Sequence, residues 1–306
     1  MTVRVVSLPL TTTNKTNEMK NLVVRTITGV LFVAALVASI VYSPYTFGLM
    51  FLIITALSTI EFCSIVNRRD DVQVNTFITT LASVCLFLGV YVHASGYADA
   101  VLALPFAAFM PYIITMIYLT VSSLYINRQT ALASWAFTMM SQVYVALPFS
   151  LLSMLSFMPY PMGPLRTVYV WIFPLAVFLF LWCSDTGAYC VGSLLGKKIP
   201  YRLFPSISPN KSWVGSIGGC LLTVTVAVAV SCFDTTLTRP QWIGFGLVVC
   251  VFGTWGDLVE SLVKRQLGIK DSGHILPGHG GMLDRFDSSL LAIPAALVYV
   301  YTIWSI

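Results

Sequence analysis

Three carboxylates near the C-terminal end of the sequence have a spacing suited to a metal ion. Asp284 and Asp287 are three residues apart, and Asp257 lies near the end of the apolar run that precedes them. Residues three apart share one face of a helix, so Asp284 and Asp287 are expected side by side. Carboxylate oxygens suit a Mg²⁺ ion shared with substrate phosphates better than a closed zinc site. The spacing therefore predicts that Asp257, Asp284 and Asp287 bind Mg²⁺.

The segment around these carboxylates also carries groups suited to phosphate. Asp257, Ser261 and Lys264 recur along one face of a helix. The run 277–281 is Pro-Gly-His-Gly-Gly, whose glycines let backbone N–H groups come close to an anion. The positive side chains around this turn are Lys264, Arg265, Lys270 and Arg285. The alternative is a basic loop at the membrane surface, but carboxylates are costly to keep near a membrane unless something pairs with them.

A second polar cluster lies upstream. It begins at Asp185, and the small residues at 188, 192 and 196 allow close packing of helices. The run Ser208–Ser212 has the sequence SPNKS and predicts a polar turn before a helix start, where Ser208, Lys211 and Ser212 are available to a phosphate. Asp185 is a weaker site candidate, either as a support for metal ligands or as a partner for a lysine.

Composition identifies the kind of protein that must position these groups. Hydrophobic residues make up 57% of the chain and charged residues 9%, with a mean hydropathy of +0.85, whereas soluble proteins carry about 25% charged residues. The chain is therefore expected to be an integral membrane protein built from helices that satisfy their own backbone hydrogen bonds. The sequence contains no basic stripe with interleaved aromatic residues, the pattern that would predict nucleic-acid binding. Its cysteines and histidines lack the spacing of a zinc site.

The apolar runs predict an all-α bundle of about nine transmembrane helices, since about 20 apolar residues cross the hydrocarbon core. The first half of the fifth run, 131–142, is less apolar and is expected to lie along the membrane interface. The nine runs lie near residues 25–42, 45–66, 74–94, 101–125, 133–157, 166–184, 212–232, 241–263 and 285–305.

The basic residues predict the orientation of this bundle. With the N-terminus in the cytoplasm and the C-terminus on the opposite side, all but Arg166 and Arg239 of the 17 lysines and arginines fall on the cytoplasmic side. The two longest polar loops, 185–211 and 264–284, then emerge on one face, where nucleotides are found.

The domain organisation follows from these runs. Residues 1–20 are polar and are expected to form a disordered tail, and residues 21–306 a single multi-pass membrane domain whose catalytic part lies mainly in 184–290. Glu61, inside the second run, is expected to be a charge partner for Arg68 and Arg69 at the interface rather than a catalyst.

The motifs together resemble the signature of phosphatidate cytidylyltransferases, also called CDP-diacylglycerol synthases. The segment 185–198 and the SPNKS run are similar to two further stretches of that family, so the resemblance covers roughly the last 120 residues. One departure is Val214, which stands where the family usually has a glutamate. The signature positions are Ser261, Lys264, Arg265, Lys270, Asp271, Gly273, Pro277, His279, Gly280, Gly281, Asp284, Arg285 and Asp287.

The resemblance implies transfer of a cytidylyl group from CTP to phosphatidic acid, which gives CDP-diacylglycerol and pyrophosphate for phospholipid biosynthesis at the cell inner membrane. It implies Mg²⁺ as cofactor, beside which family members are described with a monovalent cation. Membrane lipids are expected partners, nucleic acid is not, and a homodimer is left open. The catalytic residues would be Asp257, Lys264, Asp284 and Asp287, and the substrate-binding residues Ser208, Lys211, Ser212, Ser261, Arg265, Lys270, His279, Gly280, Gly281 and Arg285.

Individual roles follow from the chemistry of these side chains. Lys264, Arg265 and Lys270 are assigned to the triphosphate and the leaving pyrophosphate. Lys211 and Ser208 would contact phosphate from the other loop. His279 either donates a hydrogen bond to a phosphate or holds the glycine turn, and both roles stay open.

Three other classes remain as alternatives. A CTP-dependent polyprenol kinase or a cytidylyltransferase for another lipid phosphate would need similar groups. A transporter could use the aspartates as an ion relay, although the sequence lacks paired broken helices in two matching halves. CDP-alcohol phosphotransferases are disfavoured because no DGxxAR run appears.

Overall fold

The computed structural model describes residues 11–96, 106–125, 128–159, 167–196, 201–273, 275 and 280–304. In this part of the chain, eight helices are long and apolar enough to cross a membrane, and Thr26–Tyr42 is a shorter apolar helix. The expected all-α bundle of about nine spans is therefore confirmed. The eight longer spans are Pro44–Val66, Thr76–Ala94, Ala107–Tyr125, Gln129–Ser156, Ile172–Leu195, Trp213–Phe233, Arg239–Gln266 and Leu283–Trp304.

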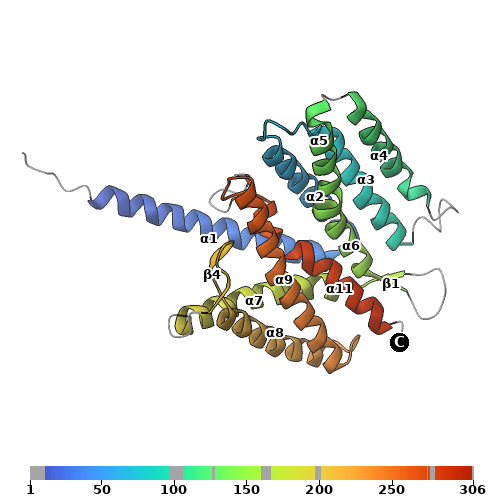
Figure 1. The fold of residues 1–306 in the computed structure, drawn as a ribbon. Coiled ribbons are helices and arrows are strands. Elements are labelled where there is room, and N and C mark those ends of the chain that lie inside the picture. Colours follow the sequence, from blue (N-terminus) through green and yellow to red (C-terminus); the bar gives the residue numbers. More distant parts are fainter. Residues whose placement is uncertain are drawn as a thin grey trace, which may run out of the picture.

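The helices between residues 44 and 156 form one group (Figure 1). α2 starts in a capping box, in which the Ser43 side chain accepts from the Thr46 N–H and Pro44 occupies the first turn. The first turns of α1 extend past the other helices in Figure 1. The elements are α1 (Thr11–Tyr42), α2 (Pro44–Val66), α3 (Thr76–Ala94), η2 (Ala107–Phe109), α4 (Met110–Ser122), η3 (Ser123–Tyr125), α5 (Arg128–Met140), η4 (Ser141–Ala146) and α6 (Leu147–Ser156).

The start of α1 differs from the expected boundary at residue 21. The helix begins at Thr11, so residues 11–20, expected in a disordered tail, continue the first span as helix. Residues 1–10 lie outside the described part of the chain.

The fifth span also differs from expectation. α5, η4 and α6 continue one another as a single helical run, with a π-helical segment at η4. Its less apolar side chains are buried inside the protein: Gln142 donates from Nε2 to Ser83 Oγ at 2.9 Å and to the Thr79 carbonyl at 3.1 Å on α3. The early part of this stretch, expected along the interface, belongs to a helix, Gln129–Ser156, that is long and apolar enough to cross a membrane, and Gln142 at its end finds its partners on a neighbouring helix.

The second half of the chain forms a second group, in which α7 packs along α8 and α9 packs against both α8 and α11. α11 also packs on α6 and so joins the two groups. The elements are β1 (Phe157–Pro159), β2 (Thr167–Tyr169), α7 (Ile172–Leu195), β3 (Arg202–Phe204), β4 (Ser208–Ser212), α8 (Trp213–Phe233), α9 (Arg239–Gln266), α10 (Leu283–Phe286) and α11 (Ser289–Trp304).

The first part of the region expected to be a polar loop, residues 185–195, is helical. α7 continues to Leu195 because glycines let it lie against α8: a Cβ on Gly219 would stand 2.6 Å from the Ser184 carbonyl oxygen. The SPNKS run is strand β4 rather than a turn, and it pairs antiparallel with β3 in the register Arg202↔Ser212 and Phe204↔Ser208. Asp185 is thereby fixed on a helix, and Lys211 on a hairpin that faces it.

Candidate active site

Four aspartates line one cavity of about 460 Å³. Asp185 comes from α7, Asp257 from α9, and Asp284 and Asp287 from α10 and its C-terminal cap. The lining also includes the apolar side chains of Phe32, Val33 and Leu36 from α1. The cavity therefore combines several carboxylates with a hydrocarbon surface.

The short helix α10 is held in place by aromatic contacts on three sides. The Phe286 ring is buried and lies 5.4 Å from Phe149 of α6, 5.8 Å from Phe178 of α7 and 6.0 Å from Phe32 of α1 between ring centroids. All three pairs have the edge-to-face geometry that aromatic rings favour. Since Asp284 and Asp287 flank Phe286 in sequence, this cluster determines where both carboxylates point.

Asp257 is brought to the same place by close packing of α9. A Cβ on Gly256 would stand 2.8 Å from the carbonyl oxygens of Asp287 and Ser288, so only glycine permits this approach. Asp257 accepts from Ser261 Oγ at 3.3 Å and forms an ion pair with Lys211 of β4. Asp257 and Ser261 are therefore neighbours as predicted, and Lys211, predicted as a phosphate contact from another loop, joins them from β4.

Asp284 is anchored by three donors. Its Oδ2 accepts from the backbone N–H of Ser272 at 2.8 Å and of Gly281 at 2.9 Å, and its Oδ1 lies 2.9 Å from Lys264 Nζ. Lys264 also pairs with Glu260, which is buried. Lys264 lines neither this cavity nor the one described below, and in this structure its ammonium group pairs with Asp284 and Glu260.

The remaining carboxylates repel one another across the cavity. The charges of Asp257 and Asp185 both act on Asp287, whose Oδ1 accepts from the Ser288 N–H at 2.5 Å. Like charges in one place favour a bound cation, and oxygen donors of this type fit Mg²⁺. Within the described residues no three His, Cys, Asp or Glu side chains stand close enough to form a closed metal site as placed, so an ion would have to draw these carboxylates together.

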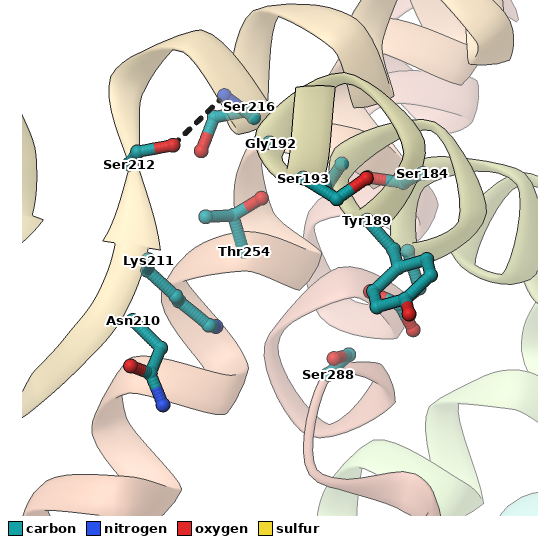
Figure 2. A pocket seen from close by; sticks show the side chains of 13 residues that line it. Ser184, Tyr189, Gly192, Ser193, Asn210, Lys211, Ser212, Ser216, Thr254 and Ser288 are labelled. Carbon is teal, nitrogen blue, oxygen red and sulfur yellow. Dashed lines mark hydrogen bonds between the residues drawn. The ribbon is translucent and has the colours of Figure 1, made fainter. Parts of the chain in front are cut away.

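A second cavity, of about 410 Å³, adjoins the first and shares Asp185 and Ser288 with it. Figure 2 shows Asn210 and Lys211 projecting from β4, with Thr254 of α9 next to them and Ser184 and Tyr189 of α7 opposite. Hydroxyl, amide and ammonium groups thus surround this cavity. It suits a polar ligand that carries phosphate.

Ser212 lies in this cavity wall but its hydroxyl serves the protein. It is the N-cap of α8 and accepts from the Gly215 N–H at 3.2 Å. Ser212→Ala is expected to lower the free energy of unfolding by about 1 kcal/mol, the usual contribution of such a cap, and to leave turnover within a few fold. Thermal unfolding in detergent and initial rates would check this, with Ser212→Asn expected to restore stability. A large loss of turnover without a loss of stability would return Ser212 to the substrate-binding set.

Of the other predicted site residues, some line a cavity and others do not. Arg285 lines the first cavity. Ser208, Arg265 and Lys270 line neither cavity, and Arg265 and Lys270 are exposed. Gly280 takes a positive φ of 81°, and Gly281 donates to Asp284, so both shape the loop. His279 lies outside the described residues.

Two carboxylates, Asp185 and Glu61, contribute more to the site than the sequence indicated. Asp185 lines both cavities, and its position in an apolar span is the signal that points to a site. Glu61 is 4% exposed and accepts from the Leu283 N–H, so the expected pairing with Arg68 and Arg69 was wrong; Arg69 pairs with Asp71 at 2.7 Å instead. The side chain of Asp71 is outside the spans, where the hydrogen bond from Arg69 lowers its pKa.

Comparison with known proteins gives a family. A family model described as "Cytidylyltransferase family" matches residues 23–303. The phosphatidate cytidylyltransferase of Staphylococcus aureus (strain COL) is 48% identical over 121 residues, which cover 39% of this chain and 45% of that relative. The protein of the same name from Staphylococcus haemolyticus (strain JCSC1435) is 47% identical over an equal share. The match thus spans about half the length of these relatives, while the family model spans nearly the whole chain. This chain belongs to the cytidylyltransferase family.

Proposed function

We propose that the protein transfers the cytidylyl group of CTP to phosphatidic acid in the cell inner membrane, releasing pyrophosphate and forming CDP-diacylglycerol. The observation that carries the proposal is the cavity lined both by four aspartates and by apolar side chains of α1. An amphiphile with a phosphate head fits such a cavity, since its chain can contact α1 while its head lies near the charged groups. The relatives named phosphatidate cytidylyltransferase support the same substrates.

The adjoining cavity supports CTP as the second substrate. Lys211 stands at its edge with Asn210, Thr254 and the hydroxyl-bearing residues of α7 (Figure 2). Because the two cavities share Asp185 and Ser288, a nucleotide in one and a lipid phosphate in the other would meet at the aspartates. Lys211 pairs with Asp257, and we propose that it turns from this carboxylate to the incoming phosphates.

The reaction requires alignment and charge neutralisation more than a strong base. A phosphate oxygen of the lipid attacks the α-phosphorus of CTP, and the bond from that phosphorus to the bridging oxygen of the β-phosphate breaks. The attacking phosphate is already ionised at neutral pH, so no side chain has to remove its proton. Asp257, Asp284 and Asp287, with Asp185 beside them, would hold Mg²⁺; the Oδ1 of Asp284 keeps a lone pair for this. When bound, the ion neutralises charge on the phosphates, and Lys211 and Arg285 add positive charge at the cavities.

Labelled CTP tests this proposal directly. Purified protein with phosphatidic acid and Mg²⁺ is expected to move label from [α-³²P]CTP into the lipid and label from [γ-³²P]CTP into pyrophosphate. Label from the γ-position in the lipid would indicate a CTP-dependent kinase. Unlabelled lipid in both reactions, combined with solute uptake into vesicles, would indicate a transporter and contradict the proposal.

A further inference from the structure

Glu61 contacts the loop of the candidate active site from the other half of the chain. It lies on α2, and its Oε2 accepts from the Leu283 N–H at 2.8 Å and from Ser272 Oγ at 3.4 Å. The side chain is 4% exposed. A buried carboxylate is strongly destabilising unless donors satisfy it. The loop supplies the donors to Oε2, whereas no described residue donates to Oε1.

The loop is shaped to fit around this carboxylate. A Cβ on Gly273 would stand 2.6 Å from Glu61 Oε1, and a Cβ on Gly281 would stand 2.6 Å from Glu61 Oε2 and 2.1 Å from Ser272 Oγ. A side chain at Gly273 would push the buried Glu61 carboxylate aside. At Gly281 it would also stand 2.8 Å from the backbone nitrogen of Gly273, so the loop itself would have to shift. Two of the signature glycines are thereby explained by the approach of Glu61.

Asp284 accepts hydrogen bonds from the same loop. Ser272 joins the two carboxylates, because its N–H donates to Asp284 Oδ2 while its hydroxyl donates to Glu61 Oε2. Gly281 N–H donates to Asp284, and the next residue but one, Leu283, donates to Glu61. The loop residues 272 and 281–283 are therefore clamped between Glu61 and Asp284, and any shift of Glu61 moves the donors of Asp284.

We propose that Glu61 is a positioning residue that holds Asp284, through Ser272 and Leu283, in the geometry needed for the divalent ion and the nucleotide. Glu61 lines neither of the two cavities, so it acts through the loop and not on the substrates. This inference rests on the proposed function. It assigns a role in the site to α2, a helix of the first half of the chain.

Kinetics of Glu61 variants test the proposal. Glu61→Ala is expected to lower kcat/KM for CTP about a hundredfold and to raise the Mg²⁺ concentration for half-maximal rate about tenfold, within the range found when groups supporting metal ligands are lost. Glu61→Gln keeps an oxygen that can accept from Leu283 and is expected within about tenfold of wild type. Thr59→Ala is the matched control, because Thr59 is buried on the same helix and its hydroxyl donates to the Thr55 carbonyl.

Two measurements separate positioning from simple support of the fold. Gly281→Ala should mimic Glu61→Ala, and the double variant should be little worse than either, since both changes break one clamp. Backbone hydrogen exchange at Ser272 and Leu283 should quicken at least about tenfold in Glu61→Ala and not in Thr59→Ala. Exchange requires no turnover, so it tests the clamp even if wild type fails to transfer label from CTP. Unchanged exchange, or a rate loss that only follows the folded fraction with an unchanged Mg²⁺ requirement, would overturn the proposal.

Discussion

Asp257→Asn is expected to lower turnover on the order of a thousandfold, the scale of one preorganised electrostatic contact at a reacting centre. Asparagine has the shape of aspartate and can still accept from Ser261, but it carries no charge for a cation or for Lys211. Initial rates with [α-³²P]CTP across a Mg²⁺ titration would measure the loss. Membrane insertion should be unaffected, because the substitution removes a charge from a transmembrane helix.

Asp71→Asn is the matched control for this experiment. It makes the same carboxylate-to-amide change at an exposed position, where Asp71 pairs with Arg69 outside the spans. Turnover should stay within twofold of wild type. If Asp257→Asn behaves like Asp71→Asn, the assignment of Asp257 to the metal is wrong.

Asp284→Asn is expected to lower both turnover and stability. Turnover should fall at least about a hundredfold, as for loss of a ligand or its support. The free energy of unfolding should fall by about 1–3 kcal/mol, because Lys264 loses one of two partners and the N–H groups of Ser272 and Gly281 lose a charged acceptor. Thermal unfolding in detergent, run beside the rate assay, measures the two effects on the same sample.

Asp287→Asn should separate these two effects. Asp287 is repelled by Asp257 and Asp185, so removing its charge relieves repulsion while removing a metal ligand. The expected result is a similar loss of turnover with an unchanged or higher Tm. Equal destabilisation by Asp284→Asn and Asp287→Asn would contradict the different environments described for these side chains.

The sequence predicted the spans and the cluster of Asp257, Asp284 and Asp287 because both depend on local patterns. Apolar runs report the length of a membrane helix directly. The end of α7 was missed because Asp185 and Thr186 look like a loop in a hydropathy profile, although their polar groups belong to a helix that borders a cavity. The SPNKS strand was missed because its partner, Arg202–Phe204, is too short to leave a pattern.

The spacing of residues along the sequence could not predict contacts between distant parts of the chain. Glu61 and Leu283 are joined by a hydrogen bond, and nothing near Glu61 in the sequence indicates that partner. Lys264 matched the expected phosphate ligand by charge and position. Its pairing with Glu260 joins residues four apart on α9 and could be inferred from spacing, but its ion pair with Asp284 joins two helices and is seen only in the folded chain. A lysine that binds phosphate and one that pairs with carboxylates look alike in a single sequence.

The ring of Phe32, in the first apolar helix, rests on Phe286, between the last two aspartates of the site. Ribosomes make proteins from the N-terminus, so α1 enters the bilayer long before α10 has been synthesised. The cavity is consequently complete only after α10 has been synthesised and has met α1. A separately expressed C-terminal half would carry the entire signature and still lack one wall, and restoring it would require α1 supplied in trans.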